Sequence, residues 1–100
     1  MSLRPVAIQE LHRLQGALLL AKSGDEAAAE HCFRQAVEIA RRQESRAWEL
    51  RATASLARLW RRQGRCNDAR AALVAVYDTF TEGFTTPDLV DARALLQQLA

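Results

Sequence analysis

Proline, glycine, cysteine and aromatic residues are all scarce in this 100-residue chain, which has two Pro, four Gly, two Cys and 6% aromatic residues. With so few residues that interrupt helices, beside 19 Ala and 14 Leu, the composition favours helical structure. No stretch alternates apolar and polar residues over more than a few positions, so we expect no strands. A chain of this size does not need a disulfide, and we interpret Cys32 and Cys66 as reduced structural residues.

Long hydrophobic runs are absent as well. The longest, ALLLA at residues 17–21, is far too short to cross a bilayer. The N-terminus does not show the basic region, apolar run and cleavage site of a secretory signal in that order. We therefore expect a cytoplasmic protein, and residues 1–4 are set aside as a leader because Met-Ser-Leu resembles a vector-derived extension.

Patterns that would indicate catalysis or metal binding are also missing. The glycines at 16, 24, 64 and 83 are isolated, which excludes a phosphate-binding loop, and neither HExxH nor CxxC occurs. The potential ligands His12, His31, Cys32 and Cys66 have no zinc-module spacing. Adjacent side chains on a helix point about 100° apart, which keeps His31 and Cys32 from one ion. The sequence therefore predicts no enzyme, with no catalytic residue, cofactor or metal.

Apolar residues recur every three or four positions in five segments, which is the spacing of α-helices. Helix signals flank these segments: Pro at a first turn, Asp, Ser, Asn or Thr as N-caps, and Gly as C-caps. The predicted boundary residues are Pro5 and Gly24, Asp25, Ser45 and Gly64, Asn67 or Asp68 and Gly83, and finally Thr86 with Pro87. The predicted inward stripes of the later helices include Ala29, Phe33, Ala36 or Val37, and Ala40; Trp48, Ala52, Leu56, and Leu59 or Trp60; Ala69, Leu73, Val76, Tyr77 and Phe80; and Leu89, Ala92, Leu96 and Leu99.

The chain repeats itself after 40 residues. The matched pairs are Ala17 with Ala57, Leu19 with Leu59, Gly24 with Gly64, and Ala29 with Ala69. A helical hairpin repeated in sequence is typical of a solenoid, in which each unit buries its face against the next. We predict an all-α fold with antiparallel hairpins over residues 5–44 and 45–83, closed by a C-terminal capping helix over residues 84–100.

The hairpins resemble the tetratricopeptide repeat. The first matches the family spacing with Gly24, Ala29, Phe33 and Ala36, and the second with Gly64, Ala69 and Leu73. The family's large inter-helix residue corresponds to Leu20 and Trp60, while Leu56 and Ala57 match its Leu-Gly pair. Val76 stands where the family has Ala, Arg13 and Thr53 stand where it has Trp, and the period exceeds the family's length of about 34 residues. The resemblance, over residues 6–82, implies two repeats in a right-handed α-solenoid that binds protein segments.

A narrower resemblance covers nearly the whole chain. The segments ELHRLQGALLL, CFRQAVEIARRQESRAWELRATASLARLWRRQGR and YDTFTEGFTTPDLVDARALLQQL are similar to the C-terminal repeats of large bacterial regulatory proteins. Those proteins join a signal-transduction ATPase domain to helical repeats, and many carry an adenylate/guanylate cyclase domain or a winged-helix transcriptional-regulator domain. This resemblance implies that the chain is one part of a larger signalling protein whose catalytic domains lie upstream.

Arginines gather in the second hairpin. Residues 41–70 hold nine Arg and three acidic residues, whereas residues 71–100 hold one Arg and four acidic residues. The resemblance places Leu11, Leu14, Leu18 and Lys22, followed by Arg51, Ala54, Arg58, Arg61 and Arg62, along the family's concave groove. Arg51, Arg58 and Arg62 share one helical face, and guanidinium groups bind carboxylates in a bidentate manner. We predict that Arg51, Arg58, Arg61 and Arg62 bind an acidic protein segment; the alternatives are solvated or internally paired arginines, or nucleic-acid binding.

The first predicted helix is apolar nearly all round, which is typical of a helix covered on more than one side. We expect an upstream repeat, or a second copy of the chain, to cover Ile8, Leu11, Leu14 and Leu18. The leading prediction is a non-catalytic interaction scaffold. The alternative is a self-association module that makes the isolated chain a dimer or other homo-oligomer.

Overall fold

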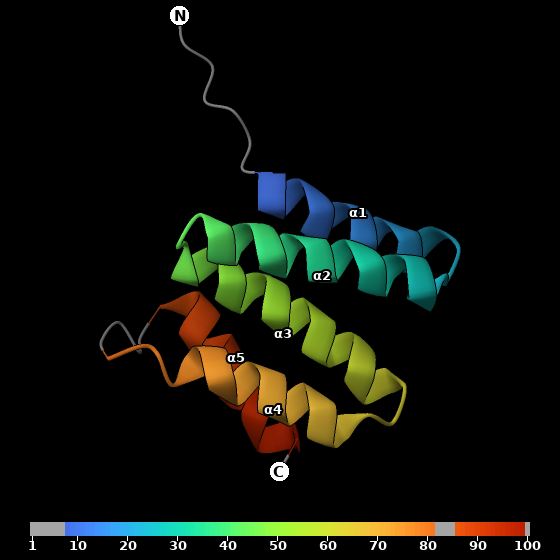
Figure 1. The fold of residues 1–100 in the computed structure, drawn as a ribbon. Helices are drawn as coiled ribbons and strands as arrows, with labels where there is room; N and C mark the ends of the chain where they lie inside the picture. Colours follow the sequence, from blue (N-terminus) through green and yellow to red (C-terminus); the bar gives the residue numbers. More distant parts are fainter. Residues whose placement is uncertain (1–7, 82–85, 100) are drawn as a thin grey trace, which may run out of the picture.

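Five α-helices make up the described part of the chain, which is residues 8–81 and 86–99 of a computed structural model (Figure 1). The helices are α1 (Ile8–Lys22), α2 (Glu26–Arg42), α3 (Arg46–Arg62), α4 (Cys66–Tyr77) and α5 (Pro87–Leu99). No strand occurs in these residues, and the all-α prediction is confirmed. None of the helices described is both long and apolar enough to cross a membrane.

The first three helices end at regular intervals. Their last residues are Lys22, Arg42 and Arg62, and each end is followed by a residue with positive φ: Gly24 at 66°, Glu44 at 54° and Gly64 at 78°. Backbone bonds close the last two of these turns, from Ser45 N to Ala40 O at 2.9 Å and from Arg65 N to Trp60 O at 2.8 Å. The left-handed caps predicted at Gly24 and Gly64 are therefore confirmed, and Glu44 provides a third.

The helix starts agree with the sequence at three points and differ at a fourth. Ser45 is the N-cap residue of α3 as predicted, although its side chain accepts no capping hydrogen bond. The Asp25 carboxylate accepts the Ala28 amide at 3.1 Å as an N-cap, and α5 begins at Pro87 as predicted. The expected start of α4 at Asn67 or Asp68 is wrong, because the tight turn after Gly64 lets that helix begin at Cys66. It ends at Tyr77, so the prediction of a helix that continues through Phe80 to Gly83 is wrong. The predicted start of the first helix at Pro5 lies outside the described residues.

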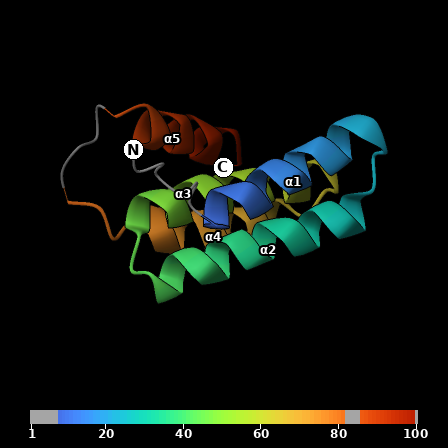
Figure 2. The same cartoon turned by 90° about the horizontal axis from the view of Figure 1, so that it is seen from above.

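The helices pack in a repeating order. Consecutive helices run antiparallel, and α3 lies at the centre, packed against all four others (Figures 1 and 2). Each later odd-numbered helix contacts the two helices before it, since α3 packs on α1 and α2, and α5 packs on α3 and α4. The described parts of α2 and α4 do not pack on each other; both lie against α3. The helix that follows each antiparallel pair therefore packs on both members of that pair: α3 on α1 and α2, and α5 on α3 and α4.

The core runs through α2, α3, α4 and α5. Its largest fully buried side chains are Phe33, Leu50, Leu59 and Leu73. The inward stripes predicted for these helices are largely buried, although four of their members are only half-buried: Trp48, Tyr77, Phe80 and Leu96. α1 contributes the partly buried Leu20 to the main buried cluster. Cys32 is half-buried, but Cys66 is exposed at the first turn of α4, so its assignment as a structural core residue is wrong.

Candidate functional site

A shallow groove of about 220 Å³, the central groove, runs over α3 between α1 and α5. It is the strongest candidate for the predicted arginine site because it contains two of the four predicted arginines. Its walls come from three odd-numbered helices that are far apart in sequence. The lining residues are Arg13 of α1; Arg51, Ala54, Ser55 and Arg58 of α3; and Asp88 and Asp91 of α5.

Arg51 is held by carboxylates of the chain itself. Its Nε and Nη2 donate to the two oxygens of Asp88 at 3.3 Å and 3.1 Å, and its Nη1 lies 3.5 Å from Glu10 Oε1. The guanidinium carbon also lies 4.8 Å from the centroid of the Trp48 ring. Asp88 occupies the first turn of α5, where the helix dipole favours a negative charge. Arg51 therefore links α1, α3 and α5, and its bidentate capacity is already used.

Glu10 and Arg13 reinforce this link from α1. They lie three residues apart on one helical face, and Arg13 Nε donates to Glu10 Oε2 at 2.9 Å. The hydrogen bond from Arg13 lowers the pKa of Glu10 against the opposing effect of burial, and the charges of Arg13 and Arg51 lower it further. The same hydrogen bond raises the pKa of Arg13. Both groups therefore remain charged at neutral pH.

Arg58 differs from Arg51 because it has no ion pair or hydrogen bond within residues 8–81 and 86–99. Its side chain is exposed and lines the central groove. It also lines a neighbouring recess of about 310 Å³ between α1 and α3, together with Arg62. Arg58 is thus the predicted site residue with the most freedom to contact another molecule.

The two remaining predicted arginines lie at the end of α3. Arg62 is exposed and reaches Glu26 of α2 at the outer limit of an ion pair, 4.0 Å. Arg61 donates to the side-chain oxygen of Gln98 on α5 at 2.7 Å. The structure therefore brings Arg51 and Arg58 into one groove, places Arg62 in the adjoining recess, and turns Arg61 toward the end of α5.

Sequence reasoning did not identify Asp88 and Asp91 as lining residues of this groove, or Glu10 as a partner of Arg51. From the sequence, Asp88 is recognisable only as an acidic residue that suits the first turn of a helix. Its partner Arg51 lies 37 positions away, so no local pattern indicates their pairing. The spacing of Glu10 and Arg13 is a local signal that could have indicated their pairing. These acids offset the positive charge expected of the groove.

The leucines predicted for self-association lie together on α1. Leu11, Leu14 and Leu18 are 47%, 48% and 53% exposed, and we call them the leucine face. Next to it is a mainly apolar recess of about 390 Å³, lined by Gln15, Leu18, Leu19, Lys22 and Cys32. The side chain of Ile8 lies outside the described residues.

The comparisons with known proteins give no relative. No family model matches the chain, and no curated protein or solved structure matches it.

Within the described residues, His, Cys, Asp and Glu form no group of three or more that could hold a metal ion.

Proposed function

We propose that this chain is a non-catalytic, tetratricopeptide-type interaction scaffold that binds an acidic protein segment in the central groove. The packing order supports two such hairpins and a closing helix stacked in a solenoid, because α3 and α5 each lie on the two helices before them. The right-handed sense of that solenoid is what the sequence resemblance implies. The narrower sequence resemblance supports a place in a larger bacterial regulatory protein of the cytoplasm.

The exposed, unpaired guanidinium of Arg58 is the observation that carries this proposal. Within the described residues it is the arginine of the central groove without an internal carboxylate partner, since Arg13 and Arg51 pair with Glu10 and Asp88. A carboxylate of a bound segment would gain a bidentate contact there at little cost in lost internal pairing. Arg62, at 4.0 Å from Glu26, provides a second contact along the same helix.

The test uses an acetylated peptide rich in glutamate as the probe and measures binding by titration calorimetry. We expect R58E to weaken binding by about tenfold or more, because the charge is reversed where the carboxylate binds. Arg70→Glu is the matched control, because Arg70 is exposed on α4 and does not line the central groove. Equal losses for the two variants, or no binding by the wild-type protein, would contradict the proposal.

Self-association is the second candidate function, and the leucine face favours it. Three leucines that are each about half exposed on one helix form a contiguous apolar surface of the kind that marks interaction sites. Sedimentation velocity at increasing protein concentration tests this candidate. We expect the wild-type protein to associate and Leu14→Glu to remain monomeric; a wild-type monomer at all concentrations would exclude it.

A further inference from the structure

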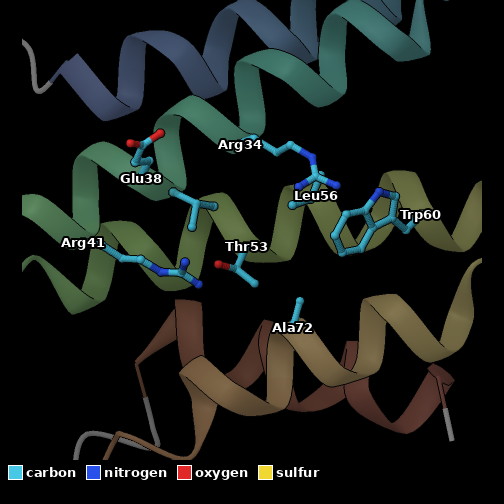
Figure 3. Close-up of a pocket in the computed structure, with 8 residues that line it drawn as sticks. Arg34, Glu38, Arg41, Thr53, Leu56, Trp60 and Ala72 are labelled. Atoms are coloured by element: carbon cyan, nitrogen blue, oxygen red, sulfur yellow. The ribbon is translucent and has the colours of Figure 1, made fainter.

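A second groove opens on the other side of α3, where α2 and α4 lie apart. We call it the Thr53 groove; it has a volume of about 400 Å³ and is shown in Figure 3. Helix α3 forms its floor, α2 supplies one wall and α4 the other (Figure 3). The lining residues are Arg34, Val37, Glu38 and Arg41 of α2; Thr53, Leu56 and Trp60 of α3; and Ala72 of α4.

Thr53 is the unusual member of this lining. It is 2% exposed, and its hydroxyl has no hydrogen-bond partner within the described residues. A buried polar group without a partner destabilises the folded protein, so such groups are rare unless something satisfies them. In Figure 3 the Thr53 hydroxyl oxygen points to the side of the groove where the Arg41 guanidinium lies. This end of the groove therefore presents a buried hydroxyl beside a cation.

The guanidinium groups of the α2 wall are only partly used. Arg41 donates from Nε to Glu49 at 2.7 Å, and its terminal amino groups make no hydrogen bond within the described residues. Arg34 donates from Nε to Glu30 at 3.0 Å and lies 5.2 Å from the Trp60 ring centroid. Glu38 is paired with Arg42 at 2.7 Å, which offsets its charge. Glu49 and Glu30 likewise offset the charges of Arg41 and Arg34, but both arginines keep terminal N–H donors that an anion can accept from.

The floor is apolar and firmly held, and the Arg34 guanidinium flanks its Trp60 end. Leu56 and Trp60 provide the floor, and Ala72 provides the α4 wall. The Trp60 indole N–H donates to Glu30 at 3.0 Å, and Arg65 lies over its ring at 4.6 Å from the centroid. Burial alone would raise the pKa of Glu30, but the hydrogen bonds from Trp60 and Arg34 and the charges of Arg34 and Arg65 together lower it. The Trp60 ring is thus fixed, and with Leu56 it provides an apolar floor that continues from the Thr53 end.

We propose that the Thr53 groove binds a small carboxylate with an apolar body. The carboxylate accepts hydrogen bonds from the Arg41 amino groups and the Thr53 hydroxyl, and the apolar part lies over Leu56 and Ala72 toward Trp60. The volume falls in the range of pockets that bind small ligands. The same chemistry occurs in free medium-chain carboxylates and in the C-terminus of a peptide that ends in an apolar residue.

The experiment titrates the complete chain with sodium octanoate, with octanol, and with an acetylated tripeptide that ends in leucine as the free acid or the amide. Binding is measured by calorimetry and by the fluorescence of Trp60 in a Trp48→Phe background, with circular dichroism to show that the fold persists. We expect one of the two acids to bind with saturation. Its uncharged counterpart should bind at least about tenfold more weakly. The arm that binds identifies the source of the carboxylate.

Two variants tie the binding to this groove. Thr53→Val keeps the shape but removes the hydroxyl; we expect roughly fivefold to tenfold weaker binding, together with a higher urea midpoint for the free protein. Arg41→Gln should weaken binding by about tenfold, whereas the control Arg70→Gln on α4, which carries the same charge change, should not. The proposal is overturned if neither acid binds at roughly 10 mM, or if Thr53→Val binds as tightly as the wild-type protein.

Discussion

At the residue scale, Gly16 on α1 lies against the buried ring of Phe33 on α2. A Cβ atom at position 16 would lie 2.7 Å from Phe33 Cε1 and 3.1 Å from the carbonyl oxygen of Ala29. The missing side chain therefore sets how closely the first two helices pack.

Gly16→Ala is expected to destabilise the protein by up to about 2 kcal/mol. Alanine gains roughly 1 kcal/mol in helix propensity, but overpacking against a buried ring costs about 1–3 kcal/mol. Urea unfolding measures the difference. In a Phe33→Leu background the ring is gone, so the same change should be neutral or stabilising; a Gly16→Ala protein more stable than the wild type would contradict the prediction.

The pairing of Glu10 predicts a pH dependence. Its pKa is lowered in the folded state, chiefly by the hydrogen bond from Arg13. Its contribution is therefore fully present above the ordinary glutamate pKa and is lost as the pH falls through the lower, folded-state value. Because Arg51 is 39% exposed, solvent screens the ion pair between Arg51 and Glu10. We therefore expect Glu10 to contribute less than about 1 kcal/mol to the free energy of unfolding.

Glu10→Gln tests this contribution in urea unfolding from about pH 7 to about pH 3. The variant should be less stable than the wild type at neutral pH, and the two should converge in acid. Glu38→Gln is a suitable control, since that glutamate pairs only on the exposed surface of α2. A difference that does not change with pH would show that Glu10 acts through packing instead of charge.

At the element scale, the turns show which parts of the fold were predictable. Gly24 and Gly64 were recognised because glycine adopts positive φ without strain, and the structure gives them 66° and 78°. Glu44 plays the same part at 54°, yet a glutamate carries no such signal in the sequence. The 40-residue period has a matching explanation, because α2 and α3 are each 17 residues long and are joined by a short turn.

Replacing Glu44 by glycine is expected to stabilise the protein. A left-handed conformation costs a residue with a Cβ atom about 1–2 kcal/mol, and the greater flexibility of glycine offsets part of that gain. We expect a net increase of roughly 0.5–1 kcal/mol in the free energy of unfolding, from urea or thermal unfolding.

Gly64→Ala provides the reverse comparison. At φ 78° it should be destabilising even though nothing lies within 4 Å of its added Cβ. If both substitutions changed stability in the same direction, backbone strain would not explain these turns.

The candidate site was less predictable than the helices, for a physical reason. The face shared by Arg51 and Arg58 follows from helical periodicity, which is local. The partners of Arg51 depend on how α1 and α5 pack on α3, and Asp88 is 37 residues away in sequence. The Thr53 groove depends on packing in the same way, because it exists only where α2 and α4 lie against α3 without touching each other.

At the scale of the whole molecule, burial is uneven between the first helix and the rest. α3 supplies six members of the main buried cluster: Leu50, Ala54, Leu56, Ala57, Leu59 and Trp60. α1 adds the partly buried Leu20, and its leucine face is about half exposed. Local opening of α1 therefore exposes less apolar surface than opening of α3, and costs less free energy.

We therefore expect the α1 amides to exchange with solvent at least about tenfold faster than those of α3 in a dilute sample. Native-state hydrogen exchange followed by NMR measures both helices in one experiment, and α3 is the internal reference. If a second copy covers the leucine face, protection of α1 should rise with protein concentration while protection of α3 changes little. Equal protection of α1 and α3 in the dilute sample would mean that Gly16, Leu20 and the link from Glu10 to Arg51 hold α1 as firmly as the core holds α3.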